Sequence, residues 1–464
     1  MPPILAAPAG AHAVPLGVTL LFAGLLVGLI VCLALEEKLH AKKSVIAGIF
    51  AVVTVLAGAA FHLLPVGPVL NIFGEALPIP VFLQGVDWAV IGIILGSSVF
   101  VDVVSRSGLF TWIAVWITKR SGGDPLRLLW LYGAMTVGFS AVLNNVTAMI
   151  IVGSLTAVSL DKLGRRDKLL GFLLVEGLLT NVGGLLTLIS SVPNIIVGTA
   201  AGISFVDFFV AAAPFTLVAF ALTVWIGARQ FKIRRLQTEA ERAEARRQVA
   251  GFDENDGIES RAFFTFSGVA TVLFIGTIAA ASVLPWVSDL GMAYVALGFA
   301  ALLLLRYKSE ADQFYRAVDW DLLAFFAALF VVINVMEHAQ VLGLIGHGLA
   351  WIIDLGDVGG SAALLASSAA FSSVTDNIPL AAMLARILEG LGTPGDSSLW
   401  WSVIFGANLG GNLTPIGSAS TLVAVTIIHK NKLPMTFGGF VKLAAPYAAA
   451  QIALATVYVL VFLR

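Results

Sequence analysis

The sequence predicts an all-α polytopic membrane protein built from two related halves. Of its 464 residues, 59% are apolar and only 12% are charged, whereas about a quarter of the residues in an ordinary soluble domain are charged. Many of the apolar residues fall into runs of about 20, the length that a helix needs to cross a bilayer. Two of these runs are interrupted by glycines, prolines and amides, and the two interruptions resemble each other.

The interruption at residues 408–421 reads Asn-Leu-Gly-Gly-Asn-Leu-Thr-Pro-Ile-Gly-Ser-Ala-Ser-Thr. The one at residues 181–194 reads Asn-Val-Gly-Gly-Leu-Leu-Thr-Leu-Ile-Ser-Ser-Val-Pro-Asn. A helix that breaks inside hydrocarbon leaves peptide groups without partners, so the break must be buried in protein or line a wet cavity. Paired breaks at matching places in two halves indicate the binding site of a secondary transporter.

The composition excludes several other classes of function. A formal net charge of −1 gives no sign of a nucleic-acid partner, and the single cysteine, Cys32, excludes an internal disulfide or a cysteine-cluster metal site. The histidines lack zinc-ligand spacing, and no Gly-rich loop ends in Lys-Ser or Lys-Thr, so the chain does not use ATP by itself. We therefore expect no catalytic residue, no metal site and no cofactor. No signal peptide is evident, because the first basic residue is Lys38.

In the first half, residues 14–35, 44–64 and 87–104 are predicted spans, and residues 108–118 are too short to cross and are expected at the interface. Basic residues in the loop 36–43 place that loop in the cytoplasm and the N-terminus outside. Residues 128–143 and 146–160 are short and have basic residues on both flanks, which predicts a re-entrant hairpin with Asn144 and Asn145 at its tip. Residues 169–202 form the first broken crossing, and residues 205–227 return.

Residues 228–262 are the one hydrophilic linker, and its basic start places it in the cytoplasm. We interpret it as a solvated interdomain helix, with a regulatory or partner-binding role as the alternative. The second half then repeats the plan. Its predicted spans are 263–285, 292–305, 322–340 and 436–463, with an interfacial piece at 342–353, a hairpin at 361–389 and a broken crossing at 399–428. This gives ten crossings and places the C-terminus outside.

The two halves keep a constant offset at three places. Asp87 matches Asp319 (319 − 87 = 232), Asn144 matches Asp376, and Pro214 matches Pro446 at the same spacing. The basic loops give the halves opposite orientations, so the repeat is inverted. The expected organisation is scaffold helices in 1–86, a first repeat in 87–227 with hairpin 128–160, linker 228–262, scaffold helices in 263–318 and a second repeat in 319–464.

The hairpin tips and breaks carry a resemblance to the ion transporter superfamily. The residues concerned are Asn145-Val-Thr147, Glu176, Thr180-Asn181-Val-Gly-Gly184, Pro193-Asn194, Asp376-Asn377-Ile-Pro379, Asn408-Leu-Gly-Gly411 and Pro415-Ile-Gly-Ser418. Within the superfamily the chain looks closest to the branch of arsenite/antimonite efflux permeases (arsenical pump membrane proteins) and P protein. The resemblance implies a scaffold domain, a moving transport domain, an elevator-like motion and a homodimer. Relatives often carry Asp-Asn at the first tip, where this chain has Asn144-Asn145, and dicarboxylate carriers carry Ser-Asn-Thr at both tips.

The candidate substrate-binding residues are amides and hydroxyls at the tips and breaks: Asn144, Asn145, Thr147, Thr187, Ser190, Ser191, Asn194, Asn377, Thr414, Ser418 and Thr421. The candidate proton-coupling residues are Asp376 and Glu176, because acidic groups inside spans are costly and functional by default. Structural alternatives are helix N-capping for Asp376 and Asn194 and an interhelical hydrogen bond for Glu176.

These residues predict a proton-coupled secondary transporter of the cytoplasmic (inner) membrane that exports arsenite or antimonite in exchange for protons. The alternative is a sodium–proton antiporter on the same fold. A dicarboxylate carrier is disfavoured because Asp376 would repel the substrate. A different class is a channel, or a subunit driven by a soluble ATPase that docks on the linker. The expected partners are the small inorganic solute, protons and membrane lipid, with no nucleic acid.

Overall fold

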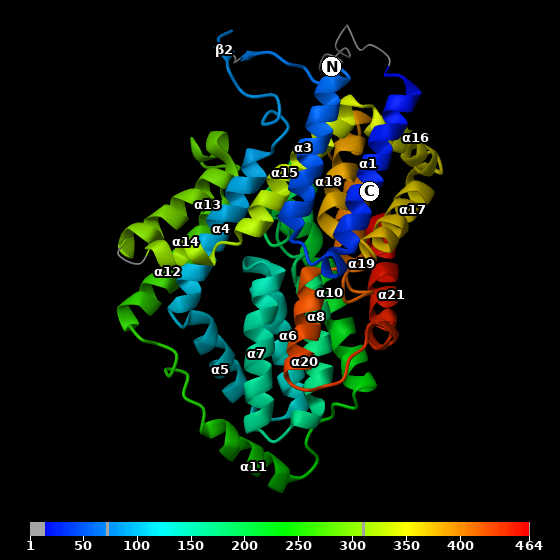
Figure 1. Cartoon of the computed structure of the whole chain (residues 1–464). Helices are drawn as coiled ribbons and strands as arrows, with labels where there is room; N and C mark the ends of the chain where they lie inside the picture. Colours follow the sequence, from blue (N-terminus) through cyan, green and yellow to red (C-terminus); the bar gives the residue numbers. More distant parts are fainter. Residues whose placement is uncertain (1–13, 71–73, 309–310, 464) are drawn as a thin grey trace. The chain divides into compact units, whose positions relative to one another are not determined.

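The computed structural model describes residues 14–70, 74–308 and 311–463, and the regular structure in them is almost entirely helical (Figure 1). Eight of the described helices are long and apolar enough to cross a membrane: α1 (Leu16–Ala34), α3 (Lys43–Ala60), α4 (Trp88–Arg106), α10 (Phe205–Gln230), α12 (Arg261–Ala279), α13 (Val287–Arg306), α15 (Trp320–His338) and α21 (Phe437–Phe462).

Two further crossings are interrupted helices. The first joins α8 (Leu169–Gly183) to α9 (Val192–Ala200), and the second joins α19 (Ser398–Gly410) to α20 (Ala419–Lys430). Together with the eight long helices they confirm the predicted fold class, an all-α inverted-repeat membrane fold of about ten crossings. The breaks cover residues 184–191 and 411–418, and both follow the same sequence of turns and bends.

Two helix pairs form the predicted hairpins. The first consists of α6 (Pro125–Val142) and α7 (Asn145–Lys162), and the second of α17 (Gly356–Ser372) and α18 (Asn377–Gly390). At each tip a short polar side chain begins the returning helix: the Asn144 side chain accepts a hydrogen bond from the backbone N–H of Thr147, and the Asp376 side chain accepts one from Ile378. Such N-caps satisfy backbone donors that a helix start leaves unpaired, so they fix where each hairpin turns.

The remaining elements are short. They are α2 (Glu36–Leu39), α5 (Leu109–Ser121), the 3-10 helix η1 (Arg166–Lys168), α11 (Glu239–Ala250), α14 (Ala311–Ala317), α16 (Val341–Ile353) and an antiparallel pair of two-residue strands, β1 (Val69–Leu70) and β2 (Ala76–Leu77). The helices α5 and α16 correspond to the two predicted interfacial pieces.

The chain divides into two compact units. The first comprises residues up to Asp87 together with Asp321–Gly348, and the second comprises Trp88–Trp320 and Leu349–Arg464. In the first unit, α1 packs on α3 through a face that includes Phe22, Leu26 and Leu29. The second unit contains both hairpins and both interrupted helices, so the candidate site lies entirely within it.

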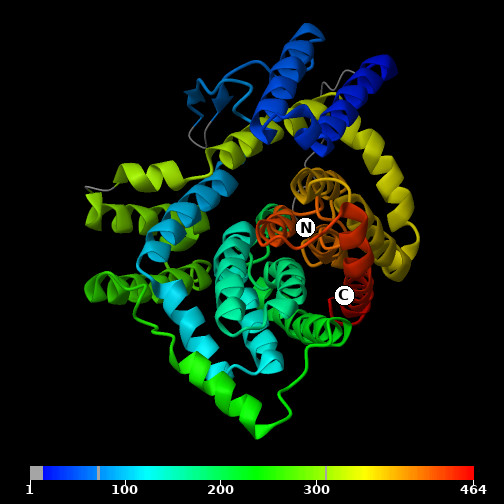
Figure 2. The same cartoon turned by 60° about the horizontal axis from the view of Figure 1, so that its bottom comes forward.

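Inside the second unit the two repeats interlock. Helix α20 of the second repeat packs on α7 of the first hairpin, and α9 of the first repeat packs on α18 of the second hairpin. Figure 2 shows the teal first-repeat helices beside the orange second-repeat helices. The half-helix after each break therefore lies against the hairpin of the other repeat, which brings the two breaks together at the centre of the unit.

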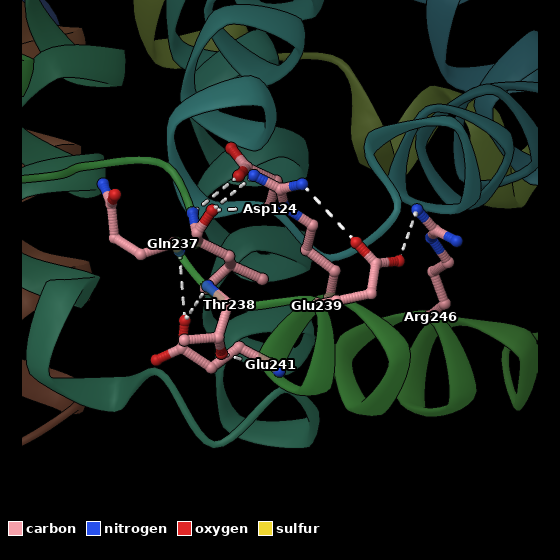
Figure 3. Close-up of polar contacts among 8 residues, drawn as sticks. Asp124, Gln237, Thr238, Glu239, Glu241 and Arg246 are labelled. Carbon is pink, nitrogen blue, oxygen red and sulfur yellow. Dashed lines mark hydrogen bonds and ion pairs between the residues drawn. The ribbon is translucent and has the colours of Figure 1, made fainter.

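The linker helix α11 is tied to the first hairpin rather than freely solvated. Asp124, the N-cap of α6, accepts hydrogen bonds from the backbone N–H groups of Arg127 (2.9 Å) and Leu236 (2.9 Å). Figure 3 shows Asp124 close to Gln237 and Thr238 at the start of α11. Thr238 and Glu241 form a capping box at the start of α11, and hydrogen bonds from the backbone and side chain of Thr238 lower the pKa of Glu241. Ala245 and Val249 are buried, so the linker is only partly solvated.

Candidate functional site

Each break is held against the hairpin of its own repeat by hydroxyl groups at equivalent positions. Thr187 donates to the carbonyl of Ala141 (2.6 Å), and Thr414 donates to the carbonyl of Ser373 (2.5 Å). Two serines donate in the reverse direction: Ser140 to the carbonyl of Thr180 (2.6 Å) and Ser372 to the carbonyl of Ala407 (2.5 Å). The carbonyls of Thr180 and Ala407 lie at the interrupted ends of α8 and α19, and those of Ala141 and Ser373 lie at the ends of the hairpin helices, so the four bonds satisfy carbonyls that helix ends leave unpaired. The predicted site residues Thr187 and Thr414 therefore fix the backbone of the breaks.

Glycines let the hairpins approach the ends of the interrupted helices. A Cβ atom on Gly183 would lie 2.7 Å from the Cα of Val137, and one on Gly410 would lie 2.2 Å from the carbonyl oxygen of Ala369. Neither separation is compatible with a side chain, since the obstructing atoms belong to the backbone. Both positions therefore require glycine for close helix contact.

Three of the predicted site residues donate hydrogen bonds to backbone carbonyls within the breaks. Asn194 donates through Nδ2 to the carbonyls of Gly184 (2.6 Å) and Thr187 (3.0 Å), and Ser190 donates to the same two carbonyls. Thr421 contacts the carbonyl of Ser418 (2.7 Å) in the second break. The N-cap of α9 is Ser191 and not Asn194, and no side-chain bond caps that helix. The N-capping alternative for Asn194 is therefore wrong.

The centre of the site is a set of amides and hydroxyls that joins the two repeats. Asn181 at the end of α8 donates to Asn412 Oδ1 (2.8 Å), and its own Oδ1 accepts from Ser418 (2.9 Å). Asn408 at the end of α19 makes the counterpart contacts, since Ser191 donates to its Oδ1 (2.7 Å) and its Nδ2 donates to Asn194 Oδ1 (2.9 Å).

These cross-repeat residues are fully or almost fully buried. Three of the residues proposed from the sequence, Ser191, Asn194 and Ser418, belong to this group. We now describe this group, consisting of Asn181, Ser191, Asn194, Asn408, Asn412, Ser418 and Ser420, as the amide cluster.

The amide cluster extends to residues that the sequence analysis did not include. Asn412 Nδ2 donates to Gln451 Oε1 (2.8 Å) on α21, and Gln451 donates to Thr223 (2.7 Å) on α10. Ser420 donates to Asn181 Oδ1 (3.2 Å). Gln451 could have been found from the sequence, because a lone amide inside an apolar span is costly unless it has a partner.

The two hairpin tips differ in how they meet the cluster. Asn145 accepts from Ser140 (2.7 Å) and donates to Asn181 Oδ1 (3.2 Å), and it lies over Gly184, where a Cβ would be 2.7 Å from Asn145 Oδ1. At the second tip, the Asn377 side chain makes no hydrogen bond with another residue of the described ranges. Asn144, Thr147, Asp376 and Asn377 are all at least partly exposed, and the bonds described for Asn144 and Asp376 are their N-caps.

Glu176 is buried on α8, five residues before Asn181. Its Oε1 accepts a hydrogen bond from Thr156 of α7 (2.6 Å), and its Oε2 has no hydrogen-bond partner among the described residues. In the described part of the chain, no lysine, arginine or histidine side chain forms an ion pair or hydrogen bond with Glu176 or with the amide cluster. The described residues also contain no group of three or more His, Cys, Asp or Glu side chains that could hold a metal ion. The buried site is therefore neutral except for the carboxyl of Glu176.

Sequence comparisons point to membrane transport. The sequence model of the family described as CitMHS, citrate transporter, matches residues 30–406. An uncharacterized transporter of Mycobacterium bovis is 30% identical over 379 residues, which are 81% of this chain and 86% of that protein. The P protein of Homo sapiens is 24% identical over 515 residues, covering 92% of this chain and 60% of that protein.

Two solved structures share the fold. The YdaH transporter of Alcanivorax borkumensis, described as having an unusual topology, has a TM-score of 0.59 at 15% identity, and the match covers 96% of this chain and 98% of that one. MtrF of Neisseria gonorrhoeae, described with a class of antimetabolite efflux pumps, has a TM-score of 0.57 at 13% identity, covering 91% and 95%. At these identities the structures establish the architecture and leave the cargo open.

Proposed function

The chain belongs to the citrate transporter family of the ion transporter superfamily, and from this premise we propose that it is a proton-coupled secondary transporter that exports arsenite or antimonite. Membrane transport is the property of the family, and the cargo and its coupling are our proposal. The observation that carries the proposal is the amide cluster, in which buried amides and hydroxyls from both breaks meet without a cationic side chain.

The chemistry of the cluster favours a small uncharged cargo rich in hydroxyl groups. Amides and hydroxyls offer both donors and acceptors, and arsenous acid, which is uncharged at neutral pH, offers both in return. In the structure these groups bond to one another, for example Asn181 to Asn412 (2.8 Å) and Ser191 to Asn408 (2.7 Å). A cargo that replaces such bonds one for one gains little net free energy. Weak binding of this kind suits a transporter, because the cargo must also be released.

The family description would favour citrate, and the site chemistry argues against it. A polycarboxylate is normally bound by arginine or lysine, whose charged hydrogen bonds offset the loss of water. No such residue contacts the amide cluster in the described ranges, and the two acidic candidates, Asp376 and Glu176, would repel an anion. We therefore rank citrate below arsenite, and keep it in the test below.

We propose that Asp376 and Glu176 exchange the coupling protons. Glu176 supports the proposal through its burial and its unpartnered Oε2, because a buried carboxyl without a cationic partner is easiest to hold as the neutral acid. Asp376 lies at the second tip, where its N-cap bond to Ile378 (3.0 Å) can be made with or without its proton. Inward flow of protons through these groups would drive outward movement of the cargo.

A sodium–proton antiporter remains the second candidate, and the second tip favours it. Asp376 and Asn377 are half-buried neighbours with three side-chain oxygens between them, and carboxylate and amide oxygens are good ligands for a hard cation. We further propose that the chain is a homodimer of the cytoplasmic membrane with both termini outside and residues 228–262 inside. A soluble ATPase that docks on this linker is a third arrangement.

The test is a solute panel on purified protein in proteoliposomes with a pH-sensitive dye inside. Arsenite, antimonite, sodium and citrate are supplied in turn across a pH gradient without ATP, and solute movement is measured by elemental analysis or radiolabel. We expect arsenite and antimonite to move with protons. Coupled movement of sodium alone, or of citrate alone, would overturn the proposed cargo, and arsenite movement only after addition of an ATPase would overturn proton coupling.

Two conservative variants separate the coupling groups. Asp376→Asn retains an N-cap of equal quality, and Glu176→Gln retains an oxygen that accepts from Thr156. Each should leave the protein folded, and we expect each to lower proton-coupled export by about a hundredfold or more, the lower end of the range for loss of a positioned proton-transfer group. A variant that exports arsenite at the wild-type rate and still moves protons would remove that residue from the mechanism.

A further inference from the structure

A row of buried hydroxyl groups leads away from Glu176 toward one end of the first hairpin. Thr156 and Ser159 lie on α7, Tyr132 on α6 and Thr118 on α5, and their exposed fractions are 0%, 4%, 0% and 1%. Burial of four hydroxyls in an apolar helix bundle is costly unless they bond to one another or to the backbone. Their arrangement is therefore informative about what the region does.

Most of the row is joined by short hydrogen bonds. Thr156 donates to Glu176 Oε1 (2.6 Å), the Tyr132 hydroxyl donates to Ser159 (2.8 Å), and the hydroxyls of Tyr132 and Thr118 are 2.5 Å apart. Thr156 and Ser159 are three residues apart on α7, so they share one face of the helix. No direct hydrogen bond joins Thr156 to Ser159 among the described residues. Glu176 Oε2 is a buried oxygen without a partner among those residues, and such oxygens are commonly bonded to an ordered water.

The row ends near the surface at a basic segment. Thr118 is followed directly by Lys119 and Arg120, both exposed. Lys119 forms an ion pair with Glu254 of the linker. A proton that reaches Thr118 is therefore one residue away from side chains in water, on the side that the basic loops assign to the cytoplasm.

Among the described helices packed against α8, Tyr132 of α6 is the titratable side chain that lies in a helix interior. Within the described elements packed against α8, the other charged or titratable groups lie in terminal turns. They are Arg127 of α6, Asp161 and Lys162 of α7, Asp207 and Arg229 of α10, His429 and Lys430 of α20, and the residues of η1.

We propose that Thr156, Ser159, Tyr132 and Thr118 form a proton path between Glu176 and the basic end of the first hairpin, with Tyr132 as its central relay. The inference rests on the proposed coupling at Glu176. Each hydroxyl accepts a proton on a lone pair and releases its own to the next oxygen, so no charge remains on the row. Rotation of the hydroxyls then restores the starting hydrogen bonds. The orphaned Oε2 of Glu176 and one water complete the step between Thr156 and Ser159.

The chain offers a matched control for the relay. Tyr447 on α21 is also fully buried, but its hydroxyl has no hydrogen-bond partner among the described residues. Tyr132→Phe and Tyr447→Phe remove the same atom from two buried rings in the same unit. Ser159→Ala removes the middle of the row with a smaller change in volume.

The experiment measures two rates in proteoliposomes for the wild type and the three variants. One is arsenite export driven by a pH gradient, and the other is exchange of labelled for unlabelled arsenite at equal pH, which needs no net proton movement. We expect Tyr132→Phe and Ser159→Ala to lower the driven rate at least about tenfold and to leave exchange within about twofold of wild type. Tyr447→Phe should leave both rates near wild type.

The outcomes separate this inference from the proposed function. A wild-type protein that moves no protons with arsenite would refute the coupling on which the path depends. If the wild type is coupled, equal effects of Tyr132→Phe and Tyr447→Phe would refute the path, and so would an equal loss of driven transport and exchange in Tyr132→Phe, because both results describe a packing role. A slowing of driven transport in heavy water that becomes larger in Ser159→Ala would support it.

Discussion

The two hairpin tips hold equivalent positions in the two repeats, yet they meet the rest of the site differently. At the first tip, Asn145 bonds to Asn181 (3.2 Å) and lies over Gly184 of the first break. At the second tip the equivalent Asn377 makes no such bond within the described residues, and the neighbours of the equivalent Gly411 are Gly417 and Ser418. The two tips therefore share one backbone arrangement, but the Asn145 side chain is hydrogen-bonded to the amide cluster and the Asn377 side chain is not.

This difference indicates which of the two hairpins can move away from the site more easily. Moving Asn145 away breaks its hydrogen bonds with the buried Ser140 and Asn181, and a buried polar group left unpaired costs about 1–3 kcal/mol. Asn377 makes no corresponding side-chain hydrogen bond within the described residues, so moving it leaves no buried group unpaired in this way. We therefore expect the second hairpin to admit cargo and the first to form the fixed wall, and the predictions below test this contrast.

The first prediction concerns thermal stability at Gly183 and Gly410, the equivalent glycines where each hairpin packs closely against the interrupted helix of its own repeat. Gly410→Ala and Gly183→Ala each place a methyl group against backbone atoms, at 2.2 Å and 2.7 Å, and overpacking of this kind costs about 1–3 kcal/mol or more. Both variants should melt at lower temperature than wild type in detergent, with Gly410→Ala the less stable. Gly438→Ala is the control, because a Cβ there meets no atom within 4 Å. Wild-type melting of either core variant would show that the breaks are looser than described.

The paired asparagines at the ends of α8 and α19 give a second test of stability. Asn181→Ala removes a hydrogen-bond partner of Asn145, Asn412 and Ser418 at once. Asn408→Ala removes one mainly from Ser191 and Asn194. At about 1–3 kcal/mol for each buried polar group left unpaired, Asn181→Ala should be the more destabilising of the two. Thermal melting gives the order, and arsenite transport should be lost in both. The opposite order would contradict the contrast, because it would mean that the bonds of Asn181, including its bond to Asn145 at the first tip, contribute less to stability than those of Asn408.

The smallest effect on stability, and the sharpest test of the contrast, comes from the tips themselves. Asn145→Ala should lower stability by about 1 kcal/mol, because it removes bonds to Ser140 and Asn181. Asn377→Ala should change stability by less than about 0.5 kcal/mol, and still reduce transport if the second tip contacts cargo. Melting and transport are compared in the same preparation. Equal destabilisation by the two variants would remove the distinction between the tips.

The sequence was sufficient to predict the breaks and the hairpins, because their signals are local. Paired glycines, Pro193, and the polar pairs Asn144-Asn145 and Asp376-Asn377 are residues that stop, start or cap helices, and they stand out in apolar runs. The use of Thr187 and Thr414 was not predictable in the same way. Both were expected to bind cargo, and in the structure both donate to carbonyls at the ends of the hairpin helices α6 and α17, where the last carbonyls lack partners within their own helix.

Long-range contacts were beyond local signals. Asn412 and Gln451 meet across 39 residues, and Tyr132 reaches Ser159 across a hairpin, so no spacing rule links them. The sequence prediction of a solvated linker also missed its packing against the first repeat. Ala245 and Val249 are four residues apart, which places them on one helix face, and the structure buries that face against the first repeat. A short apolar stripe in a strongly charged helix is easy to overlook.

Each break pairs with the opposite repeat. This arrangement bears on how the chain could have evolved by duplication and on whether its two halves can assemble as separate polypeptides. The hydrogen bonds that join the two breaks connect residues 178–194 to residues 408–420, and none of these bonds uses the connecting segment. A half-length ancestor inserted in both directions could make the same contacts with a second copy of itself. By the same reasoning, the chain cut within residues 228–262 and produced as two polypeptides should reassemble, because the cross-repeat hydrogen bonds of the amide cluster do not require the covalent connection through these residues.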